Sequence, residues 1–232
     1  MKPGSGGADG RLTAADRTQV AHIRAYPWAS GPLADDPDGV GRALAAGAVA
    51  VLAYGANASP AVLAAKLGPA AAAGVVAAAA TLAGHDVVFS AHVSAHGAIP
   101  ATLHPAPGTE VAVALLALTP SSLARLDATE PNYRRGLVAG VSCSGRPALP
   151  VQAYRSRHGA LRLGGTPVAL VAVPARARGL PALAEAELLE RVRDWLEPGA
   201  DPDAFVLAGA REPSVRGART RRLRATVTPP DE

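Results

Sequence analysis

The sequence predicts an α+β fold, in which a small mixed β-barrel has flanking N- and C-terminal helices. Several short apolar segments of strand length follow one another closely between residues 48 and 173, and only two short helical segments interrupt them. A doubly wound parallel sheet would need about one helix for each strand. The chain has 232 residues, 49% of them hydrophobic, which is enough for one packed core.

Composition and pattern divide the chain into five expected parts. These are a disordered N-terminal tail (1–11), an N-terminal helical extension (12–46), the barrel (47–175), a C-terminal helical extension (176–210) and a basic flexible tail (211–232). The N-terminal tail is polar and rich in glycine, so it cannot bury enough apolar surface to fold. The C-terminal tail is rich in arginine, and we expect it to be solvated.

The N-terminal extension should begin with a helix over residues 13–25, because Thr13 can cap its first turn. Tyr26-Pro27 ends this helix. Residues 31–41 are rich in Pro, Asp and Gly, which predicts a loop. A short helix is then expected over residues 41–46.

In the barrel, a first strand over residues 48–53 leads through a turn to a helix that starts at Ser59-Pro60 and stops at Gly68-Pro69. A second helix is expected between Thr119 and Thr129. The other predicted strands cover residues 75–82, 86–94, 99–103, 111–118, 137–143, 149–155 and 168–173, with a turn at 144–147.

The C-terminal extension should contain one amphipathic helix over residues 181–197. Leu188, Val192, Trp195 and Leu196 form its apolar stripe. Beyond this helix the pattern fades into the tail.

The composition excludes several classes of function. A single cysteine, Cys143, excludes a disulfide framework and a multi-cysteine zinc site. The chain has no glycine-rich dinucleotide loop, no Walker loop and no Gly-x-Ser-x-Gly. His92 and His96 are four apart, as in a helical metal site, but residues 87–94 are expected to form a strand and no His-Glu-x-x-His motif is present. We therefore expect the clustered histidines at the surface or the barrel mouth: His85, His92, His96 and His104. We therefore expect no cofactor and no metal.

The partners are expected to be small molecules. No apolar run is long enough to cross a bilayer, and the N-terminus lacks the pattern of a secretory signal, so we expect a cytoplasmic protein with no membrane partner. The net charge is +4, and much of the excess lies in the C-terminal arginines. No aromatic residues alternate with them, so nucleic acid binding is not expected. The sequence leaves the oligomeric state open.

A short turn between the first strand and the next helix can bind an anion. It consists of Tyr54, Gly55, Ala56 and Asn57, which we call the 54–57 loop. Backbone N–H groups at a helix N-terminus favour negative charge, and glycine lets the main chain approach a ligand closely. The alternative is an ordinary strand-to-helix turn with a buried tyrosine.

A separate acid, Glu130, ends the second helix of the barrel. The C-terminal end of a helix is the wrong end for a carboxylate, so Glu130 is either solvated or held there for a purpose. Pro131 cannot continue the helix and bends the chain after it. An acid that moves a proton, together with a loop that binds an anion, suits acyl-transfer chemistry.

Between residues 51 and 155 the chain resembles the gamma-glutamylcyclotransferase-like superfamily. Four segments match that family's pattern in order: the 54–57 loop, residues 97–103 with 107–111, residues 126–130 with Tyr133, and residues 151–154. The resemblance implies a small mixed barrel with a cavity at its mouth. It implies Glu130 as the acid/base residue, the 54–57 loop as a substrate-binding segment that uses backbone N–H groups, and Tyr133 and Tyr154 as cavity residues.

The function implied by the resemblance is the cleavage of a γ-glutamyl amide by intramolecular cyclisation to 5-oxoproline, an acyltransferase or lyase reaction. The sequence departs from the family pattern at Ala56, where serine is usual, at Ala58, where leucine is usual, and at Pro131, where glycine usually follows the acid. The departures at Ala58 and Pro131 support an alternative, a non-catalytic small-molecule binding or regulatory module on the same barrel. The sequence does not specify the amine that is attached to the γ-glutamyl group.

Overall fold

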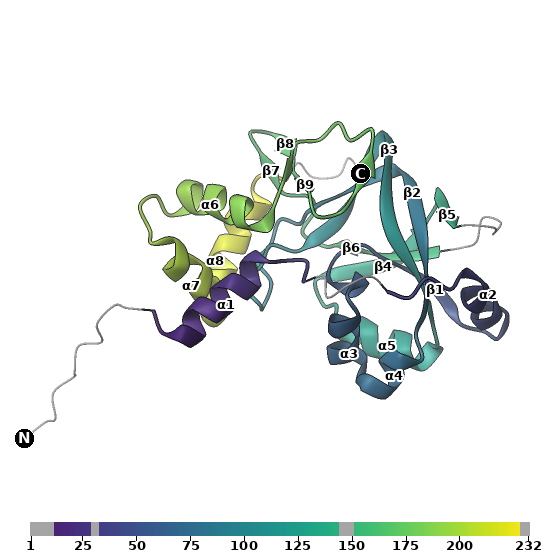
Figure 1. Cartoon of the computed structure of the whole chain (residues 1–232). Coiled ribbons are helices and arrows are strands. Elements are labelled where there is room, and N and C mark those ends of the chain that lie inside the picture. The colour runs from purple at the N-terminus through teal and green to yellow at the C-terminus, as the bar shows by residue number, and fades with distance from the viewer. Residues whose placement is uncertain (1–11, 29–32, 144–150, 228–232) are drawn as a thin grey trace, which may run out of the picture.

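The computed structural model describes residues 12–28, 33–143 and 151–227. The α+β class is confirmed, because a mixed sheet lies between two groups of helices (Figure 1). Three expected features lie outside the described residues: the N-terminal tail, the turn at 144–147 and the end of the C-terminal tail (228–232).

The main sheet has nine strands in the order β11-β9-β2-β3-β1-β6-β4, with β5 paired to β2 and β10 paired to β3. The bounds are β1 (Val49–Ala53), β2 (Val76–Phe89), β3 (Ala101–Leu118), β4 (Tyr133–Val138), β5 (Val141–Cys143), β6 (Val151–Ser156), β9 (Ala169–Leu170), β10 (Ala175–Arg176) and β11 (Ala182–Leu183). A separate hairpin consists of β7 (Arg162–Leu163) and β8 (Thr166–Pro167).

The strand order is open within the described residues, so the sheet does not close into the predicted barrel. Strands β4 and β11 lie at the two ends of the order. Closure into a barrel would require these two edge strands to hydrogen-bond to each other, and in the described part of the chain they do not pair.

Strands β2 and β3 form one long antiparallel ladder in place of four predicted short strands. The ladder continues through a bulge between Ala83 and His85. Gly84 adopts a positive φ of 72° there, a conformation that glycine tolerates best. β2 ends at Phe89, so residues 90–94, predicted as strand, belong instead to the connection between the two strands.

Strand β1 lies inside the sheet, antiparallel to β3 and parallel to β6, and residues 50–53 are buried. The two predicted helices are confirmed as α3 (Pro60–Leu67) and α5 (Pro120–Ala128); α4 (Pro69–Ala73) follows α3 directly. Helix α3 contacts both α4 and α5, and the three helices lie together below the sheet in Figure 1. This packing brings α3 and α5 together.

The first predicted helix is confirmed as α1 (Ala14–Arg24), with Thr13 as its N-cap. The next helix, α2 (Pro37–Ala45), starts inside the predicted loop. The Asp36 side chain accepts a hydrogen bond from Gly39 N–H and caps α2, and proline occupies the first position of the helix. Local capping therefore prevails over the loop-like composition.

Three helices end the described chain: α6 (Glu185–Leu196), α7 (Pro202–Arg211) and α8 (Pro213–Arg224). The prediction of a flexible tail from residue 211 is corrected, because α8 is an ordered helix. Its Arg219 is buried and pairs with Glu197, with 2.7 Å between Nε and Oε1. The prediction was based on the arginine content of the segment, which does not reveal that one arginine is buried and paired.

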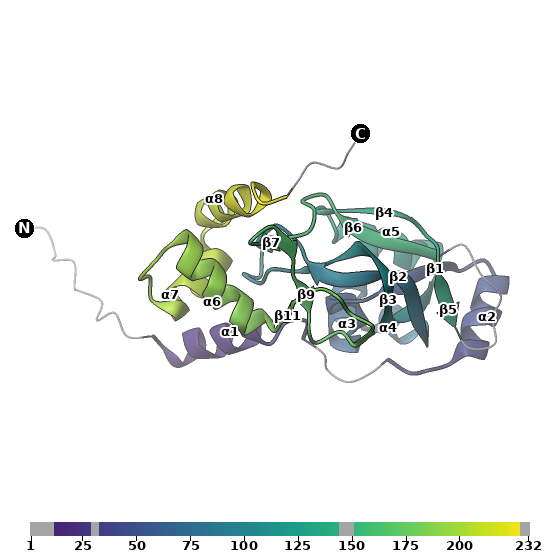
Figure 2. The same cartoon turned by 90° about the horizontal axis from the view of Figure 1, so that it is seen from above.

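Helices α1, α6, α7 and α8 form a group at one end of the sheet (Figures 1 and 2), where α7 contacts the other three. In the predicted stripe of α6, Leu188, Val192 and Leu196 are buried, but Trp195 is 40% exposed. Trp195 lies beside the guanidinium of Arg222 rather than in the core.

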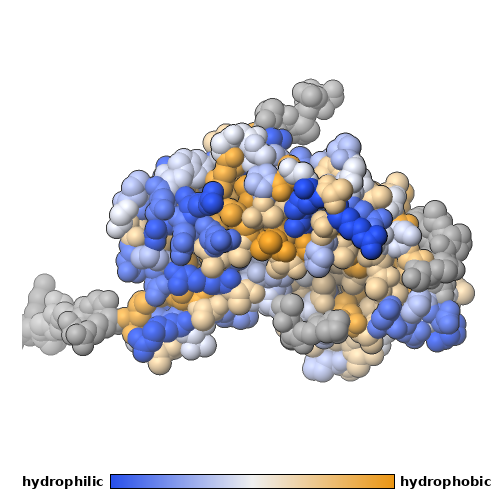
Figure 3. Space-filling model, turned by 45° about the horizontal axis from the view of Figure 1, so that its top comes forward, coloured by the Kyte–Doolittle hydropathy of each residue, from blue (hydrophilic) through white to orange (hydrophobic). Residues whose placement is uncertain are grey.

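On the face shown in Figure 3, apolar residues gather between two hydrophilic areas. The large hydrophobic side chains exposed in the described chain are Leu137, Val171 and Trp195. None of the described helices combines the length and the apolar character needed to cross a membrane.

Candidate active site

A cavity of about 720 Å³ opens where the N-terminal segment, the end of β1, α3 and the end of α5 meet. Every site residue that the sequence predicted lines this one cavity: Tyr54, Gly55, Ala56, Asn57, Glu130, Tyr133 and Tyr154. The 54–57 loop and Glu130, more than seventy positions apart in the sequence, therefore converge in space.

Two elements bring these segments together. Strand β1 ends at Ala53, and the 54–57 loop continues into a short 3-10 helix (Ala56–Ala58) before α3. At the end of α5, Glu130 N–H donates to Asp127 O at 3.1 Å, and Tyr133 N–H donates to Glu130 O at 3.0 Å. These two turns direct the carboxylate of Glu130 toward the loop.

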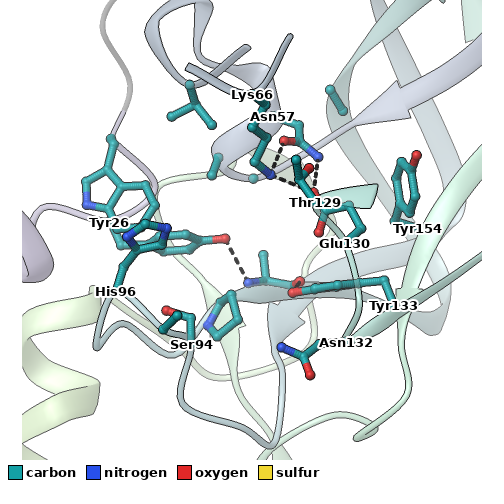
Figure 4. Close-up of a pocket in the computed structure, with 18 of the residues that line it drawn as sticks. Tyr26, Asn57, Lys66, Ser94, His96, Thr129, Glu130, Asn132, Tyr133 and Tyr154 are labelled. Carbon is teal, nitrogen blue, oxygen red and sulfur yellow. Dashed lines mark hydrogen bonds and ion pairs between the residues drawn. The ribbon is translucent and has the colours of Figure 1, made fainter. Parts of the chain in front are cut away.

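Three polar side chains form a closed triangle at this point (Figure 4). Asn57 Nδ2 donates to Glu130 Oε1 at 2.9 Å. Lys66 Nζ donates to the same oxygen at 2.6 Å and to Asn57 Oδ1 at 2.8 Å. The Glu130 side chain is 11% exposed and that of Lys66 23%. Charge-assisted bonds of this length hold the carboxylate firmly in one orientation.

Lys66 is a site residue that sequence reasoning missed. It lies on α3, in its last turn, and the chain contains only one other lysine, Lys2, among 23 basic residues. The rarity of lysine in this arginine-rich chain was the available signal for a special role. A lysine ammonium is a compact charge on a flexible stem, and an arginine guanidinium does not replace it.

Gly55 has a steric role in the cavity. A Cβ atom at this position would lie 2.8 Å from the Tyr26 hydroxyl, too close for a side chain to fit without movement. The Tyr26 hydroxyl is held in place because it accepts a hydrogen bond from Ala101 N–H at 2.8 Å. Tyr26 was missed by the sequence prediction because it belongs to the N-terminal extension, outside the family resemblance.

The three predicted tyrosines shape the wall of the cavity, and their hydroxyls are engaged elsewhere. The Tyr54 hydroxyl donates to Tyr154 O, and the Tyr133 hydroxyl donates to Ala101 O at 2.9 Å. The Tyr154 hydroxyl donates to Asp127 Oδ1 at 2.7 Å. Burial raises the pKa of each of these phenols above its ordinary value, so all three are neutral hydrogen-bond donors.

His92, one of the histidines expected at the surface or the barrel mouth, also lines the cavity and is buried there. Its ring lies 4.4 Å from the ring of His158, and its Nδ1 is 2.7 Å from Ser90 Oγ. Burial, with a smaller effect of His158, lowers the pKa of His92 to about 3. The imidazole is therefore neutral at pH 7, and it forms an uncharged part of the cavity wall that can still hydrogen-bond.

Groups of histidine, cysteine, aspartate and glutamate do not assemble into a metal-binding cluster anywhere in residues 12–28, 33–143 and 151–227. Of the acidic side chains placed by the structure, only Glu130 lines the cavity, and Lys66 is its one lining lysine or arginine. The chemistry open to these described residues is proton transfer by a carboxylate beside a fixed positive charge.

The comparisons with known proteins give structural neighbours only. No family model matches the chain, and no curated protein matches its sequence. Similar solved structures include that of At5g39720.1 from Arabidopsis thaliana, with 24% identity over 47% of this chain and 68% of that chain, at a TM-score of 0.38.

Two further neighbours extend over more of the chain. One is a gamma-glutamyl cyclotransferase with 16% identity, covering 80% of this chain and 90% of that chain, at a TM-score of 0.39. The other is the uncharacterized protein loc79017 from Homo sapiens, with 15% identity, the same two coverages and the same TM-score. One of these structures carries the name of the family that the sequence motifs resemble.

Proposed function

We propose that this chain is an enzyme of the gamma-glutamyl cyclotransferase type, which releases 5-oxoproline from a γ-glutamyl amide. The main support is the position of Glu130, whose carboxylate shares a cavity with the 54–57 loop and contacts Asn57 of that loop. A group able to move a proton and a segment able to bind negative charge therefore share one site.

In the proposed reaction the α-amine of the substrate attacks its own γ-carbonyl carbon. The new N–C bond closes a five-membered lactam, and the amide C–N bond to the departing amine breaks. Glu130 accepts the proton that the α-ammonium loses and returns it to the departing nitrogen. Because nucleophile and electrophile belong to one molecule, the main task of the protein is to hold the reactive rotamer.

Lys66 is suited to hold the α-carboxylate of the substrate. Its contacts with Asn57 and Glu130 use two of its three N–H donors, and the third would donate to this carboxylate. The α-ammonium would then face Glu130, so a zwitterionic amino acid head complements the Lys66–Glu130 ion pair. The Ala56 N–H contacts the Tyr26 hydroxyl, and the other N–H groups of the 54–57 loop would stabilise the oxygen of the γ-carbonyl as negative charge develops on it.

Replacement of Glu130 by glutamine tests the proposal, because the amide keeps the shape of the acid but cannot accept the proton. We expect Glu130→Gln to lower turnover by about 10²- to 10⁴-fold and to retain binding. Turnover is measured as 5-oxoproline release from a panel of γ-glutamyl amines and dipeptides, and binding as the rise in melting temperature.

Glu110→Gln on β3 is the matched control, because it makes the same chemical change at a partly exposed site outside the cavity. It should leave turnover and binding unchanged. Full turnover in Glu130→Gln would contradict the catalytic proposal. A wild-type protein that forms no product from any member of the panel, but gains melting temperature with one of them, would be the non-catalytic binding module.

A further inference from the structure

The cavity has two chemically different ends. One end has the polar triangle of Asn57, Lys66 and Glu130. The other end has aromatic rings, and Figure 4 shows Tyr26 and His96 across the cavity from Glu130. A cavity of about 720 Å³ is in the range that encloses a drug-sized ligand, so there is room for a second group beside a γ-glutamyl head.

Aromatic residues are concentrated here far beyond their share of the chain. Only 3% of the sequence is aromatic, with four Tyr, two Trp and two Phe, yet all four tyrosines and Trp28 line this cavity. Tyr54, Tyr133 and Tyr154 belong to the core of the site, whereas Tyr26 and Trp28 come from the segment after α1. The N-terminal extension therefore supplies its own aromatic wall.

Trp28 is the centre of this wall. Its indole stacks on His22, with 5.0 Å between ring centroids and 5° between ring planes. It meets Tyr26 edge-on at 5.0 Å and His96 edge-on at 5.6 Å. The indole Nε1 donates to His22 O at 2.7 Å, so its orientation is fixed. His22 and His96 are exposed and Trp28 is half-buried, so a ligand in the cavity can reach this group.

We propose that Trp28, His22, Tyr26 and His96 form a subsite for an aromatic ring on the departing amine, so that the preferred substrates are γ-glutamyl amides of amines that carry an aromatic ring, such as benzylamine. This inference rests on the proposed function. Offset-stacked and edge-to-face ring pairs are favourable beyond the area that they bury, and a preformed wall loses little entropy when it accepts a ring.

The charges of the cavity support the same choice. An amino acid or dipeptide as departing group would bring a second carboxylate, which needs a positive partner. Among the described lining residues the one lysine or arginine is Lys66, and it lies at the Glu130 end. An uncharged aromatic body matches the other end without such a partner.

The reaction step is the one already proposed, applied to an amide whose departing amine carries an aromatic ring. The α-nitrogen forms a bond to the γ-carbon, and the bond from that carbon to the nitrogen of the departing amine breaks. The proton that Glu130 takes from the α-ammonium passes to the departing nitrogen, so no oxidant, reductant or further reactant is needed.

Four γ-L-glutamyl amides test the inference: the benzylamide, the cyclohexylmethylamide, the methylamide and γ-glutamylglycine. The first two have nearly the same size and differ in aromaticity. We expect kcat/KM for 5-oxoproline release to be about two- to ten-fold higher for the benzylamide than for the cyclohexylmethylamide, and higher again than for the methylamide and γ-glutamylglycine. Equal values for benzylamide and cyclohexylmethylamide, or the highest value for γ-glutamylglycine, would overturn the subsite.

Trp28→Leu should lower kcat/KM for the benzylamide by about ten-fold and kcat/KM for the methylamide much less. The matched control is Trp195→Leu on α6, outside the cavity, which should affect neither substrate. His96→Ala removes an exposed edge contact of Trp28, with little risk to folding. It should also lower kcat/KM for the benzylamide relative to kcat/KM for the methylamide. If Trp28→Leu and His96→Ala lower kcat/KM equally for the two amides, or for neither, the result would count against the subsite.

A binding measurement separates failure of the subsite from failure of the proposed function. In Trp195→Phe the fluorescence comes from Trp28, because the chain has two tryptophans. Quenching of this emission by the benzylamide at lower concentration than by the cyclohexylmethylamide supports the subsite even if no 5-oxoproline is released. Product from all four amides with no such difference in quenching or rate would leave the proposed function standing and exclude the aromatic subsite.

Discussion

At the scale of single residues, the site depends on contacts between side chains that are far apart in the sequence. Asn57 and Glu130 could be selected from the sequence because each lies in a recognisable motif. Lys66 and Tyr26 lie in a helix and a turn with no chemical motif, and the rarity of lysine in this chain was the one signal for Lys66. Their roles follow only from their distances to Glu130 and to the backbone of Ala101.

Lys66→Met should weaken substrate binding by about ten- to a hundred-fold and lower kcat less, because a hydrogen bond to a charged group is lost. The measurement is KM for the γ-glutamyl amide and for its analogue with an α-carboxamide. Wild type should prefer the carboxylate, whereas Lys66→Met should not distinguish the two. A preference that survives in Lys66→Met would show that other donors hold the α-carboxylate.

His92 gives the protein a stability that depends on pH. Its pKa is about 3 in the folded chain and is ordinarily about 6.5 in an unfolded one, so the unfolded state binds more protons between these values. Stability should therefore fall as the pH drops from about 6.5 toward 3, by at most about 1.4 kcal/mol per pH unit from this group. Burial lowers the pKa of His104 and His158 in the same direction.

Urea denaturation at pH 7.5 and pH 4.5 measures how much the free energy of unfolding falls between these two pH values. His92→Asn should make this fall smaller, because asparagine can keep a contact with Ser90 but does not titrate. His96→Asn is the matched control at an exposed position and should retain the wild-type difference between the two pH values. If His92→Asn loses as much stability as wild type, the loss has another source.

At the scale of elements, cap residues and turns were predicted better than strand lengths. Thr13 and Thr119 cap the helices that they were expected to start, because a capping bond involves only nearby residues. The long strands β2 and β3 were each predicted as two pieces. Gly84 interrupts the first pattern and two prolines the second, and only pairing across the bulge makes each strand continuous.

Helix α8 was not predicted, because its arginine-rich composition is typical of a solvated tail. The guanidinium of Arg219 pairs with Glu197, donates to Phe205 O at 2.7 Å and lies 3.6 Å from the centre of the Phe205 ring. We expect Arg219→Met to lower the free energy of unfolding by about 2 kcal/mol, since bonds to a charged group are lost. Exposed Arg221→Met on the same helix should change it by less than about 0.5 kcal/mol. Equal effects in urea denaturation would contradict this anchoring.

At the scale of the whole molecule, the N-terminal helix α1 packs against helix α7 near the other end of the described chain. Arg24 of α1 pairs with Asp203 of α7 at 2.8 Å, and Arg211 pairs with Asp16 at 2.6 Å. Helix α8 also holds the connection between β2 and β3, because Thr220 Oγ1 accepts from Val93 N–H at 3.1 Å. That connection includes His92 and His96, so the C-terminal helices support one wall of the cavity.

Removal of residues 201–232 tests this support. A flexible tail could be removed without effect, but loss of α7 and α8 exposes apolar surface that Phe205, Val206 and Leu223 now cover. We expect a fall of at least several degrees in melting temperature and a lower kcat/KM for γ-glutamyl amides. An unchanged melting temperature and unchanged rate would show that these helices are dispensable for both fold and site.

The sequence by itself determined the α+β class, the helix starts at Thr13 and Thr119, and the two motifs that provide Glu130 and the 54–57 loop. These features are local: each depends on residues within a turn or a strand of one another. Only the tertiary structure decided that the sheet stays open, that α8 is ordered, and that Lys66, Tyr26 and Trp28 join the cavity. Such features depend on which surfaces meet when the chain packs, and that is set by burial and charge pairing across long separations.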